Sequence, residues 1–299
     1  MKVCTFERNG QKRLGAVVEQ GIIDVMEALE TTPAKDVPKT MDELYQNNKT
    51  AIKKLENYIT SLSITENASF LAEEESLDFK APITNPGKII CVGLNYKQHA
   101  DETGAPYPET PILFSKFNNT LTGHKHVVEI PVETEQVDYE VELAIIVGEK
   151  MKAVSKEEAI NGVFGYCTAN DLSARDLQFK TPQWLLGKTC DGFSPMGPYV
   201  VTADEVEDPQ KLHVKTIVNG KIRQNSSTSD MIFSCDTILS YISRHMTLEP
   251  GDIILTGTPE GVILGDPEPE RVYLKAGDTV TVEIEQLGSL TNTFIEEKV

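Results

Sequence analysis

Two glutamates stand two residues apart in an otherwise apolar segment. Glu140 and Glu142 lie in DYEVELAIIVG, residues 138–148, whose β-branched residues predict a strand. Side chains at i and i+2 of a strand share a face, so the carboxylates are expected roughly 7 Å apart. Glutamates are rarely buried without a partner, so a buried pair requires a cation, either a basic side chain or a metal ion. The alternative is an edge strand with a solvated polar face.

A third acid follows a second strand-like stretch. Asp171 comes directly after GYCTAN, and a helix-like stretch follows it. Three carboxylates without cysteine or histidine favour Mg²⁺ or Mn²⁺ and disfavour zinc. We expect no nearby basic residue to neutralise these acids, which favours the metal. The alternative for Asp171 is a helix N-cap or turn position, with Ser173 and Asp176 offering a competing capping box.

A histidine and a glutamate follow the apolar run KIICVG at a spacing of three residues. If the segment is helical, His99 and Glu102 share a face, and the carboxylate would orient the imidazole and raise its basicity, as a general base requires. The proline-rich residues 103–111 are typical of a movable cover. A surface histidine with an accidental acidic neighbour is the alternative.

Two further segments offer groups that can contact a substrate. Lys188 would counter the charge of an oxyanion, unless it is a solvated loop lysine. Gly257 and Thr258 would offer a backbone N–H and a hydroxyl to a carboxylate. The spacing of a phosphate loop is absent from both segments. His124 and His126 lack further ligands at metal-binding spacing and are interpreted as loop residues.

The composition narrows the class of protein. The chain has 299 residues, with 28 lysines and arginines against 46 aspartates and glutamates, giving a formal net charge of −18. Such a charge repels phosphate backbones and anionic lipid surfaces, so we expect neither nucleic acid nor membrane partners. The five cysteines contain no C-x-x-C pair, which argues against a disulfide framework. Without a signal-like apolar start or a run of membrane-spanning length, we expect a cytoplasmic protein.

The elements that must position these residues form two regions. Residues 1–81 begin with short alternating segments that predict a meander, and residues 41–62 carry apolar positions at helical spacing. From residue 82 onward, short apolar strands dominate, as in a rolled or sandwiched β architecture. Asn219-Gly220 predicts a hairpin, Ser155 and Glu158 have capping-box spacing, and residues 229–246 predict a helix. The fold class is therefore α+β, mostly β.

A series of motifs occurs in the order found in the fumarylacetoacetate hydrolase superfamily, which the chain resembles from about residue 88 to 299. These motifs are GLNYKQHADETG, FSK, DYEVELAIIVG, GYCTANDLSARDLQ, LGKTCDGFSPMGP, VNGKIRQ, SSTSDMIFS, LEPGDIILTGTPEGV and AGDTVTVEIE. The resemblance implies a mixed β-roll catalytic domain at 82–299, a small N-terminal β-rich domain at 1–81, and a homodimer. It also implies Mg²⁺ or Mn²⁺ held by Glu140, Glu142 and Asp171.

The same resemblance implies roles for residues of the site. His99 and Glu102 match a catalytic pair on a lid helix, and Lys188 matches an active-site lysine. Positions that hold the substrate's carboxylate and keto group match Arg175, Gln178 and Thr258, and Lys116 matches a second lysine. Residues 179–186 depart from the family pattern, so the substrate's distal group is not specified.

The residues and the resemblance together indicate chemistry on a small 2-keto acid. The metal would chelate the 1-carboxylate and the 2-keto oxygen and stabilise the enolate that forms when the C3–C4 bond breaks. Acylpyruvate hydrolysis and oxaloacetate decarboxylation both fit. The first alternative is isomerisation of an unsaturated keto diacid, resembling 2-hydroxyhepta-2,4-diene-1,7-dioate isomerase. The second, from another class, is a metal-binding β protein without catalysis.

Overall fold

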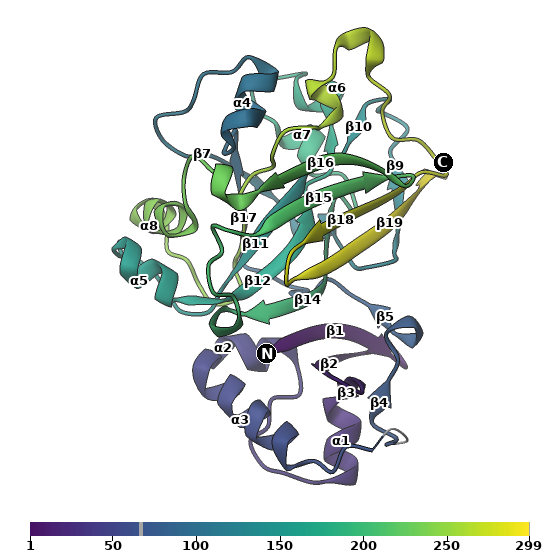
Figure 1. Ribbon diagram of the computed structural model, residues 1–299, viewed down its shortest axis with the longest axis vertical. Helices are drawn as coiled ribbons and strands as arrows, with labels where there is room; N and C mark the ends of the chain where they lie inside the picture. Colours follow the sequence, from purple (N-terminus) through teal and green to yellow (C-terminus); the bar gives the residue numbers. More distant parts are fainter. Residues whose placement is uncertain (66–67, 299) are drawn as a thin grey trace.

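One twelve-stranded sheet runs through the computed structural model, which describes residues 1–65 and 68–298 (Figure 1). Its main path is β4-β3-β2-β1-β14-β12-β11-β17-β6-β7, with β5 beside β1 and β8 beside β14. Because Lys2 of β1 pairs with Val201 of β14, the sheet continues from the N-terminal residues into the rest of the chain. The division between residues 81 and 82 stays a prediction. The strands are β1 (Lys2–Arg8), β2 (Gln11–Val18), β3 (Gly21–Asp24), β4 (Leu71–Ala72), β5 (Asp78–Phe79), β6 (Ile89–Gly93), β7 (Ile112–Lys116), β8 (Leu121–Thr122), β11 (Val141–Val147), β12 (Val163–Asn170), β14 (Ser194–Thr202) and β17 (Ile253–Leu255).

A five-stranded sheet packs against β11 and β12, in the order β16-β15-β18-β19-β9 (Figure 1). Both large sheets are mixed, because β17 runs parallel to β6 and β19 runs parallel to β9. A two-stranded sheet, β10-β13, completes the set. The expected α+β, mostly β class is confirmed. The remaining strands are β9 (Val127–Ile130), β10 (Val137–Asp138), β13 (Ser173–Ala174), β15 (His213–Val218), β16 (Lys221–Ser227), β18 (Thr279–Ile284) and β19 (Gly288–Glu296).

Strand β11 lies at the centre of the core and is buried on both faces. Leu143 and Ile145 pack into the cluster that includes Val282 of the five-stranded sheet. The alternate residues Ala144 and Ile146 pack into the cluster formed with the N-terminal helices. Side chains alternate between faces along a strand, so one apolar run supplies two cores. The helices are α1 (Val25–Thr31), α2 (Met41–Gln46), α3 (Asn48–Ser61), α4 (Lys97–Thr103), α5 (Lys156–Asn161), α6 (Arg175–Gln178), α7 (Leu185–Lys188) and α8 (Cys235–His245).

Two predicted helices differ from the structure. The helix expected over 41–62 is split into α2 and α3 at Asn47, and Asn48 adopts a φ of 35°, a left-handed conformation that asparagine tolerates. The helix expected over 229–246 begins only at Cys235. The preceding residues are held by Asn95, whose backbone oxygen accepts from Ile232 N at 2.7 Å. Tertiary hydrogen bonds therefore outweigh the helical periodicity there.

The other local predictions are confirmed. Strands β1 to β3 form the expected N-terminal meander. Asn219 and Gly220 both have positive φ between β15 and β16, as a type I′ hairpin requires. Ser155 and Glu158 form a reciprocal capping box on α5.

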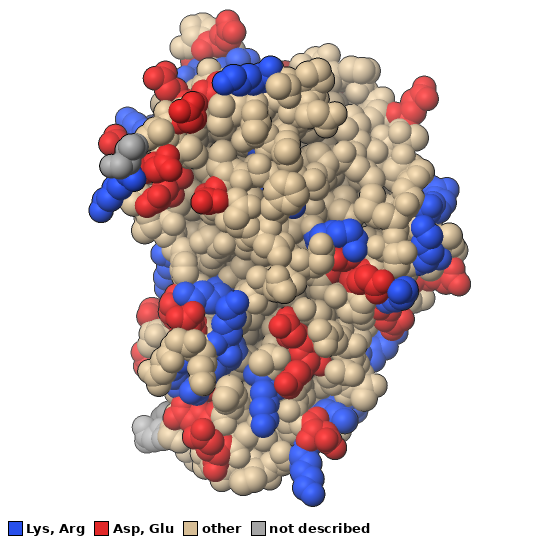
Figure 2. All heavy atoms as spheres, turned by 180° about the vertical axis from the view of Figure 1, so that it is seen from behind, with Lys and Arg blue, Asp and Glu red and all other residues tan. Residues whose placement is uncertain are grey.

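The surface carries charges of both signs. Seen from behind, uncharged residues cover much of the upper part of the molecule, whereas acidic and basic residues crowd the lower part (Figure 2). The net charge of −18 is therefore not gathered into one acidic patch on this face. A helix long and apolar enough to span a membrane is absent from the described part of the chain.

Candidate active site

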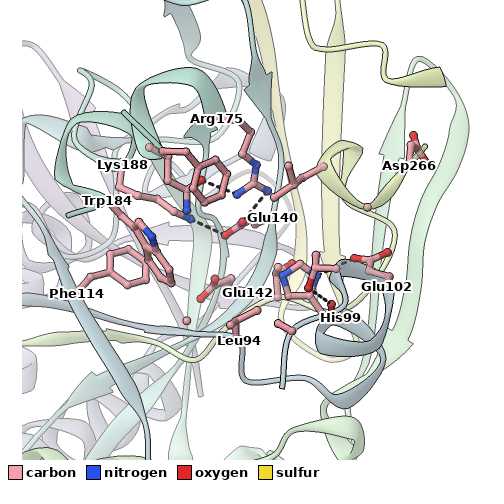
Figure 3. Close-up of a pocket in the computed structure, with 18 of the residues that line it drawn as sticks. Leu94, His99, Glu102, Phe114, Glu140, Glu142, Arg175, Trp184, Lys188 and Asp266 are labelled. Atoms are coloured by element: carbon pink, nitrogen blue, oxygen red, sulfur yellow. Dashed lines mark hydrogen bonds and ion pairs between the residues drawn. The ribbon is translucent and has the colours of Figure 1, made fainter. Parts of the chain in front are cut away.

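A cavity of about 560 Å³ opens at the ends of the central strands. Glu140 and Glu142 lie in its centre, with Trp184 to one side and His99 to the other (Figure 3). Other residues that line the cavity include Arg175, Phe114, Gln178, Lys188, Thr258 and Arg271. Glu140 and Glu142 therefore face the same space as the His–Glu pair.

The structure brings the three predicted metal-ligating acids together. Glu140, Glu142 and Asp171 are buried, and one carboxylate oxygen from each lies within 4.8 Å of the others. Glu142 lies on β11, and Asp171 directly follows the neighbouring strand β12. Adjacent antiparallel strands thus bring acids 29 positions apart in sequence, Glu142 and Asp171, to one point.

Glu140 reaches this point because the predicted strand 138–148 is interrupted. Asp138 ends β10, which pairs with β13, and β11 begins only at Val141. Between them, the backbone N–H of Glu140 donates to the side chain of Asn170 at 2.9 Å, and its carbonyl accepts from Asp171 N at 2.9 Å. These two hydrogen bonds lie outside the regular strand pairing and hold Glu140 beside Asp171.

The expectation that no basic residue neutralises the acids is wrong. Lys188 Nζ lies 2.7 Å from Glu140 Oε2 and 2.8 Å from Asp171 Oδ2. Arg175 Nη2 lies 2.8 Å from Glu140 Oε1, and Lys116 pairs with the other oxygen of Asp171. Buried carboxylates require such partners, and the fold supplies them from residues distant in sequence.

Glu142 has no such cation among the described residues. Its side chain accepts a hydrogen bond from Gly257 N at 2.7 Å. Burial, together with repulsion from Asp171 and Glu140, raises the pKa of Glu142 well above its usual value. Burial also opposes ionisation of Glu140, but Lys188 and Arg175 outweigh it and lower the pKa of Glu140 to about 2.

This charge distribution fits a divalent cation. Within the described residues, the cluster of four buried acids has three buried cations as partners, so one acid, Glu142, lacks a counter-charge. The acids are Asp138, Glu140, Glu142 and Asp171, and the cations are Lys116, Arg175 and Lys188. Oxygen ligands alone suit a hard cation. A bound divalent cation would make the cluster net positive, which suits an anionic substrate.

His99 and Glu102 form the predicted pair on α4. His99 Nδ1 lies 2.7 Å from Glu102 Oε1, and since an ionised carboxylate only accepts, Nδ1 carries the proton. Nε2 has no hydrogen-bond partner among residues 1–65 and 68–298. The buried imidazole, which lines the cavity, thus has one fixed and one available nitrogen.

The predicted substrate-contacting residues lie in different environments. Arg175, Gln178 and Thr258 line the cavity. Thr258 Oγ1 accepts from Gln224 Nε2 at 2.9 Å, so its own hydrogen remains available to a ligand. Lys116 instead lies behind Asp171, where it also donates to the carbonyl of Phe193 at 2.6 Å.

Two sequence interpretations need correction. The N–H of Gly257, expected to meet a substrate carboxylate, donates to Glu142 instead. The competing capping box of Ser173 and Asp176 does not form, because Asp176 accepts from Thr134 Oγ1 at 2.5 Å. Helix α6 has Ala174 at its N-cap, without a side-chain hydrogen bond. Asp171 is therefore not a helix cap.

The sequence analysis missed Asp138 and the aromatic wall. Asp138 is fully buried and accepts from Arg175 Nε at 2.9 Å and from Ile263 N at 2.9 Å. Its place two residues before Glu140 was the available clue. The ring centroids of Phe114 and Trp184 lie 5.4 Å apart in an edge-to-face arrangement. Phe114 lies shortly before Lys116 in the sequence, and Trp184 lies shortly before Lys188.

Comparisons with known proteins match this chain to one family. The family described as fumarylacetoacetate (FAA) hydrolase C-terminal matches residues 88–295. A fumarylacetoacetate hydrolase domain-containing protein 2 homolog of Dictyostelium discoideum is 44% identical over 98% of this chain and 96% of its own length. A mitochondrial oxaloacetate tautomerase, fahd2, of Xenopus laevis is 41% identical over 87% of this chain and 79% of its own.

Solved structures share the whole fold. A fumarylacetoacetate hydrolase from Exiguobacterium antarcticum superposes with a TM-score of 0.81 at 35% identity, over 99% of this chain and 100% of that chain. A maleylpyruvate hydrolase from Sphingobium, in complex with manganese(II) and pyruvate, has a TM-score of 0.78 at 29% identity, with both chains fully covered.

Proposed function

The chain belongs to the fumarylacetoacetate hydrolase family, and we propose that it is a Mg²⁺- or Mn²⁺-dependent enzyme that interconverts the enol and keto forms of oxaloacetate. The observation that carries the proposal is the placement of His99, whose Nε2 has no partner among the described residues, in the same cavity as Lys188, Glu140 and Glu142. The tautomerase from Xenopus laevis, 41% identical, supports the choice of reaction.

Tautomerisation requires only a proton transfer. From the keto form, C3 gives a proton to His99 and the enolate oxygen on C2 takes a proton from solvent water. Ketonisation reverses both transfers, and no bond between heavy atoms breaks. His99 Nε2 is the available base for C3, and Glu102 stabilises the imidazolium that results. Reprotonation of C3 by this imidazolium completes the reverse direction.

The opposite side of the cavity stabilises the charge that develops on the C2 oxygen. Lys188 is a donor fixed between Glu140 and Asp171, and burial, which opposes its charge, is outweighed by these two acids, so that the pKa of Lys188 is raised. It therefore stays cationic throughout the reaction. A divalent cation held by Glu140, Glu142 and Asp171 would act as a Lewis acid toward the 1-carboxylate and the C2 oxygen.

The test separates proton transfer from bond cleavage. Enol-oxaloacetate, prepared in dry solvent, is diluted into buffer containing Mg²⁺ or Mn²⁺, and the loss of enol absorbance is followed. Pyruvate is measured in parallel with lactate dehydrogenase. We expect enol loss above the spontaneous rate, in proportion to enzyme, with pyruvate at background. Enol loss at the buffer rate would refute the proposal.

C3–C4 cleavage is the second candidate function. It is favoured by the maleylpyruvate hydrolase that shares the fold and whose complex contains pyruvate. With an acylpyruvate, His99 would deprotonate a water molecule that attacks the C4 carbonyl, and pyruvate enolate would leave; with oxaloacetate, CO₂ would leave and no water attack is needed. Pyruvate formed as fast as the enol disappears would favour this function. His245→Ala, which removes an exposed histidine on α8, is the matched control for His99→Ala in either assay.

A further inference from the structure

Arg271 differs from the other cations that line the cavity. Arg175 has all three guanidinium nitrogens engaged by Asp138, Glu140 and Gln178. Lys188 is held by two acids. Arg271 uses Nε to donate to the backbone carbonyl of Asp266 at 2.9 Å, and it pairs with no carboxylate in the described ranges. It is therefore the cavity cation that a ligand anion reaches without displacing an acid.

We propose that Arg271 binds the carboxylate at the far end of the substrate, and so makes the site selective for keto dicarboxylates. The inference rests on the proposed function, in which the C2 end of the substrate faces Lys188 and the acid cluster. A four-carbon keto diacid carries a second carboxylate at C4, which needs its own cation. A planar guanidinium suits a carboxylate because it donates two parallel hydrogen bonds.

The segment that carries Arg271, residues 261–271, is fixed over the cavity and is called the strap here. At one end, Gly261 N donates to Glu102 Oε2 at 2.9 Å. In the middle, the N–H groups of Ile263 and Leu264 donate to Asp138 at 2.9 and 3.0 Å. These bonds tie the strap to both halves of the site, so its position is set by the same residues that orient His99 and Arg175.

At the other end of the strap, Arg271 contacts the Tyr273 hydroxyl and pairs with no carboxylate of the described residues. Arg223, from β16, pairs with the carboxylate of Asp266, the residue whose backbone carbonyl anchors Arg271, so this carboxylate already has a cation. The bond from Nε to the Asp266 carbonyl orients the guanidinium without neutralising it. A fixed backbone and a guanidinium that is oriented by uncharged partners are the features of a preorganised anion site.

Binding is measured through Trp184, which is the only tryptophan in the sequence and lines the cavity. Malate and lactate are the probes, because both carry the 2-hydroxy acid end and only malate has the second carboxylate. Titration is followed by Trp184 fluorescence in the presence of Mg²⁺. We expect Arg271→Gln to weaken malate binding ~10- to 100-fold and to leave lactate binding unchanged, as for a lost charge-assisted hydrogen bond.

Matched variants separate direct binding from a structural effect. Arg271→Lys, which keeps the charge, should recover part of the malate affinity. Arg244→Gln, which removes an exposed arginine on α8, should bind malate as the wild type does. Equal weakening of malate and lactate by Arg271→Gln, no effect on either, or a wild type that binds malate no better than lactate would overturn the inference.

Activity gives a second and separable test. The 4-ethyl ester of oxaloacetate lacks the distal charge, so Arg271→Gln should raise KM for oxaloacetate and not for the ester. If the wild type fails to ketonise either compound while the preference for malate depends on Arg271, the proposed reaction is wrong and the dicarboxylate site stands. If ketonisation is found and KM rises equally for both substrates, the reaction stands and the inference fails.

Discussion

Glu102 holds His99 with one carboxylate oxygen and the strap with the other. Oε1 lies 2.7 Å from His99 Nδ1, and Oε2 accepts from Gly261 N at 2.9 Å. Gly265 packs so closely that a Cβ built there would lie 2.4 Å from Oε2. One carboxylate therefore fixes the imidazole and joins α4 to the strap, which places the proposed proton transfer and the proposed recognition of the distal carboxylate on one connected unit.

Replacing Glu102 by glutamine should lower activity without destabilising the fold. Glutamine keeps one acceptor oxygen and replaces the other with an NH₂ group, so it cannot accept from both His99 and Gly261. The imidazole therefore loses either its hydrogen bond or the negative charge beside it. We expect kcat for enol-oxaloacetate to fall ~10- to 100-fold while the urea midpoint changes little. Glu109→Gln, in the exposed loop after α4, is the control. An unchanged kcat would mean that Glu102 does not orient the base.

Glu140 and Glu142 should have opposite effects on the stability of the metal-free protein. Glu140→Gln leaves Lys188 and Arg175 short of a counter-charge, and breaking a buried ion pair costs about 3–5 kcal/mol. Glu142→Gln removes the acid that lacks a cation, and should raise the free energy of unfolding. Urea unfolding in EDTA measures both changes.

The same two variants and Asp171→Asn should behave alike toward metal. Calorimetric titration with Mn²⁺ is expected to show weakened binding in Glu140→Gln, Glu142→Gln and Asp171→Asn, because each removes a charged oxygen ligand. Undiminished binding in all three would contradict the assignment of the metal site. Equal destabilisation of the metal-free protein by Glu140→Gln and Glu142→Gln would contradict the charge distribution described above.

The sequence predicted the acids better than their partners. Glu140, Glu142 and Asp171 stand out because acidic residues are rare in strand-like segments, and their spacing already indicates a shared face. Lys116 and Lys188 approach Asp171 from separate segments, and nothing in their local sequence specifies that contact. The α+β class follows from strand and turn patterns, whereas the contacts across the cavity depend on how the strands are ordered in the sheet.

Long-range hydrogen bonds account for the other differences. In place of the predicted first turns of the 229–246 helix, the chain forms a short 3₁₀ helix, Thr228–Asp230, and an irregular segment that Asn95 holds through bonds to residues more than a hundred positions away. Gln224 likewise reaches Val141 N at 3.0 Å from the hairpin that Asn219-Gly220 predicts. The periodicity of a sequence indicates apolar positions and turns, but it does not indicate which single polar side chains join distant segments.

Stability of the metal-free protein should depend on pH in two opposite ways. The pKa of Glu142 is raised above its unfolded value of 4.5, so stability falls as pH rises from 4.5 through the folded pKa. The pKa of Glu140 is lowered to about 2, so its contribution is present above 4.5 and is lost as pH falls toward 2. Urea midpoints in EDTA should therefore decline from about pH 5 upward in the wild type.

Glu142→Gln is the direct check on that decline. Without this carboxyl, the loss of stability toward neutral pH should be reduced, while the acid-side loss due to Glu140 should remain. Identical slopes for the wild type and Glu142→Gln above pH 4.5 would show that Glu142 titrates normally in the folded protein.

Gly93→Ala should disturb the aromatic wall of the cavity. A Cβ at Gly93, the last residue of β6, would lie 2.5 Å from the Trp184 ring, so the indole must move. Overpacking of this kind costs about 1–3 kcal/mol. The expected result is a lower urea midpoint with a shifted Trp184 emission maximum. Combining it with Trp184→Phe should recover part of the stability, and a purely additive pair would show that the ring is not the obstacle.

The last prediction concerns His99 and distinguishes the two candidate reactions. Ketonisation of enol-oxaloacetate needs a proton at C3, and a positioned acid–base group contributes ~10²–10⁴ in rate. We therefore expect His99→Ala to reduce ketonisation by this factor. Decarboxylation of oxaloacetate breaks the C3–C4 bond without a base, so any such activity should fall much less. The measurement is kcat for both reactions at saturating Mg²⁺.

A lid role for His99 gives a different pattern. If the imidazole only orders α4 and the 103–111 loop, closure weakens for every substrate, and both rates fall by the same factor. Glu102→Gln distinguishes the two roles of His99, because it keeps the size of the side chain beside the imidazole and removes its charge. A ratio of ketonisation to decarboxylation that stays constant in His99→Ala would remove His99 from the proton transfer. A ratio that falls, together with a smaller fall in Glu102→Gln, assigns the proton at C3 to the imidazole and its orientation to Glu102.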